Sequence, residues 1–343
     1  MYNNVMTGIS RHDKSPRDHG LDFDSKHPER VAIVSLSDIN TSPIEFESKP
    51  RYEASVRISG NPNNNDPNKE CRDRAFVAPS GGLGVFDGVG KLEGSAQIAE
   101  GAKNLLSRYL EELPLDTSPR DAQKYITGSL MTTRDALTAY NQELPEDQRG
   151  ATTATVAKIV RNQGRSYLVY GSIGDSRLMV YRPSNDSLRD ITLDETAIGA
   201  RKPYNKRVSE QQALDGIKTK NDLASLPLHH QIAYEHRHNI GEHAIGTGSR
   251  HIPQTGYREV EAGDIVIGVS DGYTDNLTVE ERRGLLREAV EQNGGPSVAS
   301  VEQITAYMDS TIQEIMKPDE SNENIRVKPD DAAVAALRVG WSA

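Results

Sequence analysis

Few residues in this chain are of the kinds that mark secreted or membrane-embedded proteins. Its 343 residues include one cysteine, Cys71, which excludes an intramolecular disulfide and suits a reducing compartment. No apolar run approaches the roughly 20 residues that a membrane-spanning helix needs, and Met1 begins a polar stretch without the apolar segment of a secretory signal. We therefore expect a cytoplasmic protein that does not associate with membranes.

Positive charge is also scarce. The chain has 40 Lys and Arg against 50 Asp and Glu, a formal net charge of −10 at pH 7. Proteins that bind nucleic acid generally, or that bind anionic membrane surfaces, need basic surfaces. The sequence therefore predicts that neither nucleic acid nor membrane is a partner.

Hydrophobic residues make up only 35% of the chain, and their deficit is concentrated at the start. Residues 1–50 are rich in Asp, Ser, Asn and Pro, and only residues 30–36 have the composition of a strand. We interpret residues 1–50 as a polar N-terminal extension that is partly disordered or peripheral. Residues 51–340 are long enough to bury a substantial core as one domain.

Within residues 51–340 the apolar pattern predicts strands, two helices, strands, two helices and a final strand. Helical spacing covers residues 93–113, 119–143, 297–316 and a segment starting at 278. Pro119 suits a first helical turn, and Thr278 with Glu281 forms a capping box. Short β-branched or alternating runs predict strands at 52–59, 74–77, 83–86, 152–160, 166–172, 177–181, 265–270 and 332–337.

Tight turns join several of the predicted strands directly. Asn162-Gln163-Gly164 and Ile173-Gly174-Asp175-Ser176 each separate consecutive strands, as in antiparallel hairpins. Residues 195–255 are polar, with helical patches and no clear strands, which predicts an inserted flap. The fold class that follows is α+β, an antiparallel β-sandwich flanked by pairs of antiparallel helices.

Acidic residues stand at the ends of three apolar runs. Asp87-Gly88 follows residues 83–86, Asp271-Gly272 follows residues 265–270, and Asp330-Asp331 precedes residues 332–337. One Asp-Gly pair alone is typical of a structural turn, but carboxylates gathered at strand ends repel one another unless a cation lies between them. Oxygen ligands without cysteine pairs favour Mg²⁺ or Mn²⁺ over structural zinc. Two such ions about 3.5–4 Å apart would activate a bridging water.

Together with two further motifs, these sites resemble the metal-dependent, type 2C (PPM-type) serine/threonine protein phosphatases. The motifs occur in family order over about residues 52–339. They are Phe86-Asp87-Gly88-Val89-Gly90, Gly150-Ala151-Thr152-Thr153-Ala154, Gly174-Asp175-Ser176-Arg177, Ser270-Asp271-Gly272-Tyr273-Thr274-Asp275 and Asp330-Asp331.

The resemblance implies a four-layer α-β-β-α fold and hydrolysis of phosphoserine or phosphothreonine in a protein substrate. A metal-bridging water would attack phosphorus without a phosphoenzyme intermediate. It also implies two Mg²⁺ or Mn²⁺ ions, with a third, weaker one in many members. We expect a monomer.

Site residues follow from the resemblance motif by motif. Asp87, Asp271 and Asp330 would be the catalytic aspartates, with Asp87 bridging both ions. The metal ligands implied are Asp73, Asp87, the Gly88 carbonyl, Asp271 and Asp330, with Asp147 and Asp275 for the third ion. We interpret Asp175 as a structural turn residue that caps backbone amides.

The chain departs from the family pattern near its first acidic motif. Arg72 stands where an acidic ligand is expected, and Asn68 stands where the phosphate-binding arginine is expected. Arg72 or Lys69 is therefore the candidate phosphate-binding residue, since a guanidinium can hold a phosphate bidentately. Val89 replaces a histidine proposed as general acid in some members, so a bound water would protonate the leaving group.

These departures leave a second hypothesis open. The chain could be a catalytically weak or inactive relative that binds a signalling partner, although three costly carboxylates argue against a mere scaffold. A haloacid-type phosphatase is disfavoured because Asp87 is followed by Gly88 and Val89 instead of a second aspartate at i+2. The flap histidines lack the i, i+4 pair of a helical zinc site and are interpreted as a solvated face: His229, His230, His236, His238 and His243.

Overall fold

The structure is a computed structural model that describes residues 52–62, 70–90, 94–196, 202–248, 251–317 and 324–340. The predicted extension at residues 1–50, with its strand at 30–36, lies outside the described residues. Asn68 and Lys69 also lie outside them.

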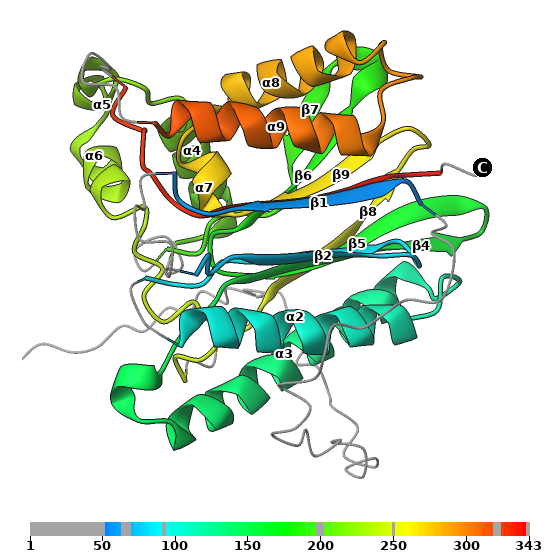
Figure 1. Ribbon diagram of the computed structural model, residues 1–343, viewed down its shortest axis with the longest axis horizontal. Helices are drawn as coiled ribbons and strands as arrows, with labels where there is room; N and C mark the ends of the chain where they lie inside the picture. Colours follow the sequence, from blue (N-terminus) through cyan, green and yellow to red (C-terminus); the bar gives the residue numbers. More distant parts are fainter. Residues whose placement is uncertain are drawn as a thin grey trace, which may run out of the picture. The chain divides into compact units, whose positions relative to one another are not determined.

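Two five-stranded antiparallel sheets face each other (Figure 1). Sheet A has the order β1 (Ala54–Ser59), β10 (Ala332–Arg338), β9 (Ile265–Val269), β6 (Arg177–Arg182) and β7 (Ser187–Asp190). Sheet B has the order β2 (Arg74–Ala78), β3 (Gly82–Phe86), β4 (Ala154–Asn162), β5 (Arg165–Ile173) and β8 (Gln254–Val260).

A continuous apolar core fills the space between the sheets. Leu83 and Val85 of β3 contribute to it from sheet B, and Val266 of β9 and Leu337 of β10 contribute from sheet A. The predicted hairpin at residues 162–164 is present, because Gln163 and Gly164 have φ of 50° and 76°, as a two-residue primed turn requires.

Helix pairs cover the outer face of each sheet, so the predicted four-layer α+β fold is confirmed (Figure 1). The helices begin where their caps predict: the Ser118 hydroxyl accepts from the Asp121 amide, and Thr278 and Glu281 form the capping box. Among the described residues, no helix is both long and apolar enough to cross a membrane. Sheet B is covered by α2 (Ser95–Glu112) and α3 (Pro119–Glu143), and sheet A by α8 (Val279–Gln292) and α9 (Val301–Ile315).

The flap predicted between residues 195 and 255 contains three short helices at one end of the sandwich (Figure 1). They are α4 (Tyr204–Asp215), α5 (Lys220–Ser225) and α6 (Leu228–Glu235). Short 3-10 turns occupy Glu146–Gln148 and Pro183–Asn185, and α7 (Asp271–Thr274) follows β9.

Two strands, β7 and β8, were not predicted. Each lies at the edge of its sheet, where one side has no strand neighbour. Their sequences, SLRD and QTGYREV, are accordingly polar, and most of their residues are only partly buried. Edge strands therefore lack the apolar runs that identified the central strands.

Candidate metal centre

The three strand-end aspartates are brought together at one end of the sandwich. Asp87 follows β3 of sheet B, while Asp271 follows β9 and Asp330 precedes β10 in sheet A. Antiparallel pairing of β9 with β10 places the end of one strand beside the start of the other. All three aspartates line a single pocket of about 350 Å³, and Gly88 lines it too.

The first Asp-Gly turn is held in place by the neighbouring threonine motif. The Asp87 amide donates to Thr153 Oγ1 at 3.0 Å, and the Asp87 carbonyl accepts from the Thr153 amide at 2.9 Å and from Thr152 Oγ1 at 2.8 Å. Thr153 Oγ1 also lies 2.8 Å from Ser176 Oγ. Because the backbone of Asp87 is fixed on both sides, its carboxyl group is directed into the pocket.

Segments of both sheets are linked by Asp331. Its Oδ1 accepts from the Asn61 amide at 2.9 Å, and its Oδ2 accepts from the Arg72 amide at 2.8 Å. Gly272 packs against this residue so closely that a Cβ atom there would lie 2.2 Å from the Asp331 carbonyl oxygen. The second Asp-Gly turn therefore requires glycine for close approach, as well as for the turn itself.

Buried carboxyl groups crowd this end of the sandwich without enough hydrogen-bond donors. Asp73 is 1% exposed, and its Oδ2 has no hydrogen-bond partner. The Asp87 and Asp271 carboxyl groups share a hydrogen bond, which requires a proton between two groups that normally repel each other. The unpartnered oxygen of Asp73 and the neighbouring carboxyls of Asp87 and Asp271 are oxygen ligands of the kind that a hard cation binds.

Their titration behaviour has the same cause. Burial, and then the negative charges of Asp271 and Asp73, raise the pKa of Asp87 well above its ordinary value. Burial likewise raises the pKa of Asp73, and although a hydrogen bond from Ser270 opposes this, the charge of Asp271 adds to it. Each acid is thus destabilised in its charged form, and a bound cation would relieve that cost.

A lysine that sequence reasoning missed lies among the acids of sheet A. Lys328 Nζ is 2.8 Å from Asp271 Oδ2, 2.8 Å from Asp330 Oδ2 and 3.3 Å from Asp275 Oδ2. Burial alone would lower the pKa of Lys328, but the three carboxylates together raise it above its ordinary value. The ammonium group is therefore charged and partnered on this side of the pocket.

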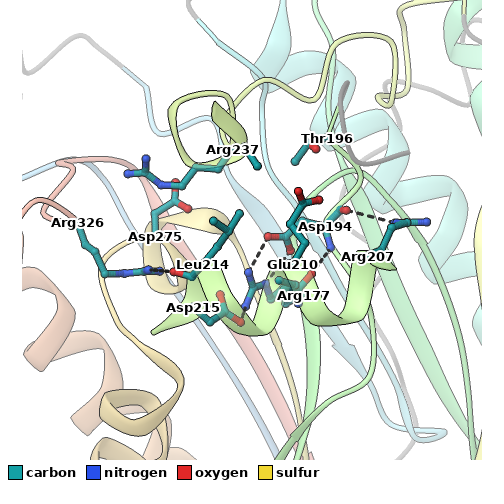
Figure 2. Close-up of a pocket in the computed structure, with 12 residues that line it drawn as sticks. Arg177, Asp194, Thr196, Arg207, Glu210, Leu214, Asp215, Arg237, Asp275 and Arg326 are labelled. Atoms are coloured by element: carbon teal, nitrogen blue, oxygen red, sulfur yellow. Dashed lines mark hydrogen bonds and ion pairs between the residues drawn. The ribbon is translucent and has the colours of Figure 1, made fainter. Parts of the chain in front are cut away.

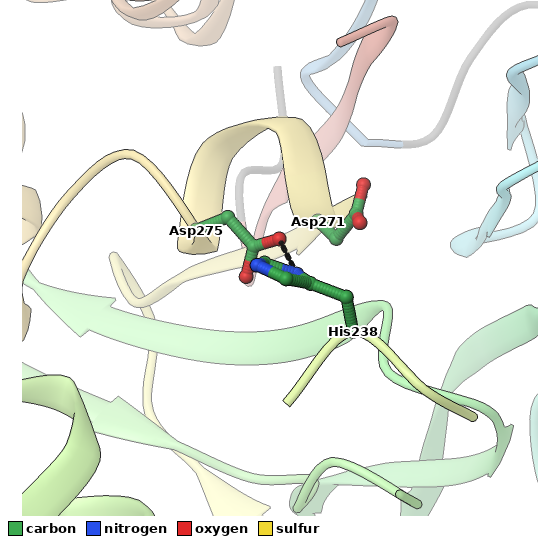
Figure 3. Close-up of side chains that lie close together, drawn as sticks. All are labelled: His238, Asp271 and Asp275. Carbon is green, nitrogen blue, oxygen red and sulfur yellow. Dashed lines mark ion pairs between the residues drawn. The ribbon is translucent and has the colours of Figure 1, made fainter. Parts of the chain in front are cut away.

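The flap contributes a histidine to the same group of residues (Figure 3). His238 Nδ1 lies 2.5 Å from Asp275 Oδ2, and one ligand atom each of His238, Asp271 and Asp275 lie within 4.8 Å of one another. Burial opposes ionisation of Asp275, but the hydrogen bond from His238 and the charge of Lys328 lower its pKa. His238 therefore contacts an acidic group while its side chain stays exposed to solvent. The prediction of a solvated face is wrong for His243, which is only 6% exposed.

The sequence predicted that Asp147 is a metal ligand and Asp175 a turn residue, but the structure places Asp175, and not Asp147, in the pocket. Asp147 lies in the exposed 3-10 turn Glu146–Gln148 and does not line the pocket, so the structure does not bring it to the other aspartates. Asp175 is buried and lines the pocket instead. Burial, and then the charge of Asp271, raise the pKa of Asp175, which indicates that it belongs to the acidic group more than to a simple turn.

Arg72, the candidate phosphate ligand, does line the pocket. Its Nε makes no hydrogen bond and lies 3.8 Å from Asp331 Oδ2. A Cβ atom on Gly88 would lie 2.6 Å from the Arg72 Cβ, so the arginine segment packs directly on the first Asp-Gly turn. Lys69, the other candidate, lies outside the described residues.

A second cluster of buried charges lies where α4 packs against sheet A (Figure 2). Arg177 donates from Nε and Nη2 to Asp194 at 2.7 and 2.6 Å, and from Nη1 to Asp215 at 2.8 Å. Arg282 contacts Asp215 at 3.3 Å and Asp190 at 3.2 Å. Here each carboxylate contacts a guanidinium, so none of these carboxylates requires a metal ion. The contacts join helix α4 of the flap to strand β6 of the core.

The sequence itself carries a weak signal for two of the missed residues. Lys328 stands two positions before Asp330, and Asp175 belongs to the quoted Gly-Asp-Ser-Arg motif. His238 has no such signal, because only the folding of the flap over the pocket brings it to Asp275.

Solved structures with the same fold cover most of the described chain. Phosphatase PstP/Ppp of Mycobacterium tuberculosis is 20% identical, with a TM-score of 0.56 over 84% of this chain and 98% of that one. Stp1 of Staphylococcus aureus is 16% identical, with a TM-score of 0.60 over 88% of this chain and 100% of that one. A structure of the PstP catalytic domain with two manganese ions is 19% identical, with a TM-score of 0.56 over 84% and 97% of the two chains.

The likeness is therefore one of fold. No protein-family profile matches the sequence, and no curated protein matches it by sequence. The chain has the fold of the PPM-type serine/threonine phosphatases, as its motifs predicted.

Proposed function

We propose that this protein is a Mg²⁺- or Mn²⁺-dependent phosphatase that removes phosphate from phosphoserine and phosphothreonine in proteins. The observation that carries the proposal is the group formed by the buried Asp73 and the partly buried Asp87 and Asp271, which includes one oxygen without a partner. Solved structures with this fold are serine/threonine phosphatases, and one of them holds two manganese ions. The fold and the donor set thus support the same chemistry.

The residues present fit a divalent cation best on the sheet B side of the pocket. Asp87 with Gly88 and the unpartnered Asp73 would hold an ion there, and Asp271 would reach it from sheet A. Asp330 and Asp275 complete the acidic set on the sheet A side, with Asp175 in place of Asp147. Divalent ions bound to such oxygens supply Lewis acidity to a phosphate and make water a stronger nucleophile.

The chain itself supplies positioning and charge. Threonines 152 and 153 fix the backbone of Asp87, so its carboxyl does not need to reorganise when substrate binds. The Arg72 guanidinium faces the same pocket and has hydrogen-bonding capacity that Asp331 does not use. We assign it to the phosphate oxygens, where a charge-assisted contact orients the substrate phosphorus.

A second candidate function is a non-catalytic, phosphatase-like binding or regulatory protein. The observation that favours it is the presence of two basic side chains, Arg72 and Lys328, at a centre that would otherwise attract only cations. Cytoplasmic location, a monomeric state and the identity of the phosphorylated substrate stay predictions from the sequence.

Hydrolysis of a phosphothreonine peptide separates the two candidates. The full chain is stripped of metal and phosphate release is measured with Mn²⁺, with Mg²⁺ and with excess EDTA. The phosphatase proposal expects turnover with either ion and none above background in EDTA. A folded protein that releases no phosphate at any metal concentration would instead support the binding function.

A further inference from the structure

We propose that Lys328 is a resident cation of the acidic centre, and that its ammonium group takes the place of one divalent ion between Asp271, Asp275 and Asp330. The inference rests on the metal centre of the proposed function, but it concerns how many ions the chain binds. It predicts that the unaltered protein holds divalent metal only on the Asp73 and Asp87 side of the pocket.

The contacts of the ammonium group carry the argument. Lys328 Nζ lies 2.8 Å from Oδ2 of both Asp271 and Asp330 and 3.3 Å from Oδ2 of Asp275. These three carboxylates come from two segments, α7 and residues 330–331, which converge on the single nitrogen. An ammonium has three N–H donors, so three acceptors saturate it.

The position of Lys328 is built into the fold. The Lys328 amide donates to Asn276 Oδ1 at 2.7 Å, and the Lys328 carbonyl accepts from Asn276 Nδ2 at 2.9 Å. Asn276 itself is 1% exposed. Pro329 restricts the backbone of the residue before it to extended conformations. Because its backbone is fixed in this way, the Lys328 side chain is directed toward the carboxylates.

The preceding residues are fixed in the same way. The Arg326 guanidinium donates to the Thr274 carbonyl at 2.6 Å and to the Leu214 carbonyl at 3.0 Å. Thr274 belongs to α7 and Leu214 to α4, so the segment that carries Lys328 is attached to both walls of the site. A lysine that merely bridged surface acids would not need such support.

A divalent ion and this ammonium group compete for the same oxygens. Mg²⁺ requires carboxylate oxygens at about 2.0–2.1 Å in octahedral geometry. Oδ2 of Asp271 accepts a hydrogen bond from Lys328 and Oδ2 of Asp330 forms an ion pair with it, so a metal ion between them would face a positive charge within a few ångströms. Asp73 Oδ2 has no hydrogen-bond partner, so no ammonium group competes with a metal ion for it.

The test counts ions, not turnovers. Metal-free full-length protein is titrated with Mn²⁺, and free Mn²⁺ is measured by electron paramagnetic resonance. Lys328→Met keeps the length of the side chain but removes its charge, so we expect one additional Mn²⁺ per chain, or at least tenfold tighter binding of the last ion. Lys317→Met is the matched control, because Lys317 is an exposed partner of Glu314 near the same segment. It should bind like the unaltered protein.

Thermal unfolding covers the case in which Lys328→Met folds poorly. Without metal the variant removes the ammonium group that Asp271, Asp275 and Asp330 share, and it should melt at a lower temperature. Saturating Mn²⁺ should then raise its melting temperature more than that of the unaltered protein, since the stabilisation grows with the number of bound ions and with their affinity. Lys328→Arg retains the charge and should keep the original ion count.

Two results would overturn the inference. One is the same number and affinity of Mn²⁺ ions, within twofold, in Lys328→Met and the unaltered protein. The other is a Lys328→Met chain that stays unfolded at saturating Mn²⁺, since metal could then not replace the ammonium. Neither result depends on phosphate release, so the phosphatase proposal can fail or hold separately.

Discussion

Two clusters of charged side chains among the described residues differ in their balance of positive and negative charge. Around Arg177 and Arg282, each carboxylate of Asp190, Asp194 and Asp215 contacts a guanidinium. In the second cluster, the pocket aspartates Asp87 and Asp271 face each other, and one oxygen of the buried Asp73 contacts no donor. Asp275 lines the cavity beside the Arg177 cluster (Figure 2) and contacts His238 and Lys328, which line the other cavity.

The balance of charge distinguishes the structural cluster from the candidate functional one more clearly than burial does. Both clusters contain several charges, yet in only one of them do the basic side chains of the protein leave carboxylates without a positive partner. Stability favours the balanced arrangement, so the unbalanced one indicates a ligand. Breaking a pair in the first cluster should therefore cost folding energy, whereas removing an acid from the second should cost activity.

The largest effect is expected for Arg177→Met. This change leaves Asp194 without a guanidinium partner and Asp215 with Arg282 alone, and breaking a buried pair in this way costs about 3–5 kcal/mol of unfolding free energy. Urea unfolding of the metal-free protein measures the loss. Arg165→Met breaks an exposed pair with Glu259 and should cost about 1 kcal/mol or less. Equal losses in the two variants would show that the Arg177 cluster does not brace the fold.

Asp87→Asn should have the opposite profile. Phosphopeptide turnover is expected to fall at least a hundredfold, about 2.7 kcal/mol, because a charged metal ligand is lost. Stability of the metal-free protein should not fall, since a repulsion with Asp271 is relieved. Asp147→Asn is the control and should stay within about twofold of the original rate, because Asp147 lies in an exposed turn. Turnover near the original in Asp87→Asn would contradict the metal assignment.

Glu195 lies between the two clusters and gives a pH test. It follows Asp194 in the chain, its Oε2 accepts from the Gly174 amide at 3.3 Å, and burial raises its pKa to about 7 from 4.5. The folded state thus binds its proton more tightly than the unfolded state does. The side chain is neutral in both states below about pH 4.5, and its penalty grows as pH rises to about 7 and is constant above that.

Glu195→Gln removes this dependence. The variant should gain about 2–3 kcal/mol of unfolding free energy relative to the original protein between pH 4.5 and pH 7.5. Urea unfolding of both proteins at several pH values provides the comparison, and the difference cancels the contribution of the pocket aspartates. A difference that does not change with pH would mean that Glu195 is ionised at little cost in the fold.

The smallest effect is expected for Arg72→Ala. If Arg72 holds the phosphate, its loss should raise KM for phosphopeptide about tenfold and leave the Mn²⁺ dependence of activity unchanged. If Arg72 instead weakens a metal site, Arg72→Glu should restore a carboxylate and lower the Mn²⁺ concentration needed for half-maximal activity. A Mn²⁺ titration of the two variants and the original protein decides between these cases.

Local signals in the sequence were sufficient for most of the fold. Helix α3 spans Pro119–Glu143 as predicted because Ser118 and Pro119 define its start in the chain itself. The central strands β3 and β9 are buried on both faces and therefore consist of apolar runs. The edge strands β7 and β8 depend on a single neighbour and have no such run, so pairing that only the tertiary structure creates determines them.

The site residues also divide into those that local sequence signals identify and those that only the tertiary structure brings together. Asp87 and Asp271 could be found because each ends an apolar run with glycine after it. Asp147 is three residues before Gly150 in the sequence, yet it lies in an exposed 3-10 turn and does not line the pocket. Lys328 has only its closeness to Asp330 as a signal, because Asn276 holds its backbone through tertiary contacts. His238 has no signal, because only the folded flap brings it to Asp275.

Strand order also sets when the centre can form. Strand β10 is the last described strand, and it pairs with β1 on one side and β9 on the other. Sheet B is complete once residues 254–260 are available, whereas the middle of sheet A stays open until residues 332–338 arrive. Pairing across so long a loop is slow. On the ribosome, therefore, a nascent chain cannot bring Lys328 and Asp330 to Asp87 until the final strand has been synthesised, and truncated products carry no assembled centre.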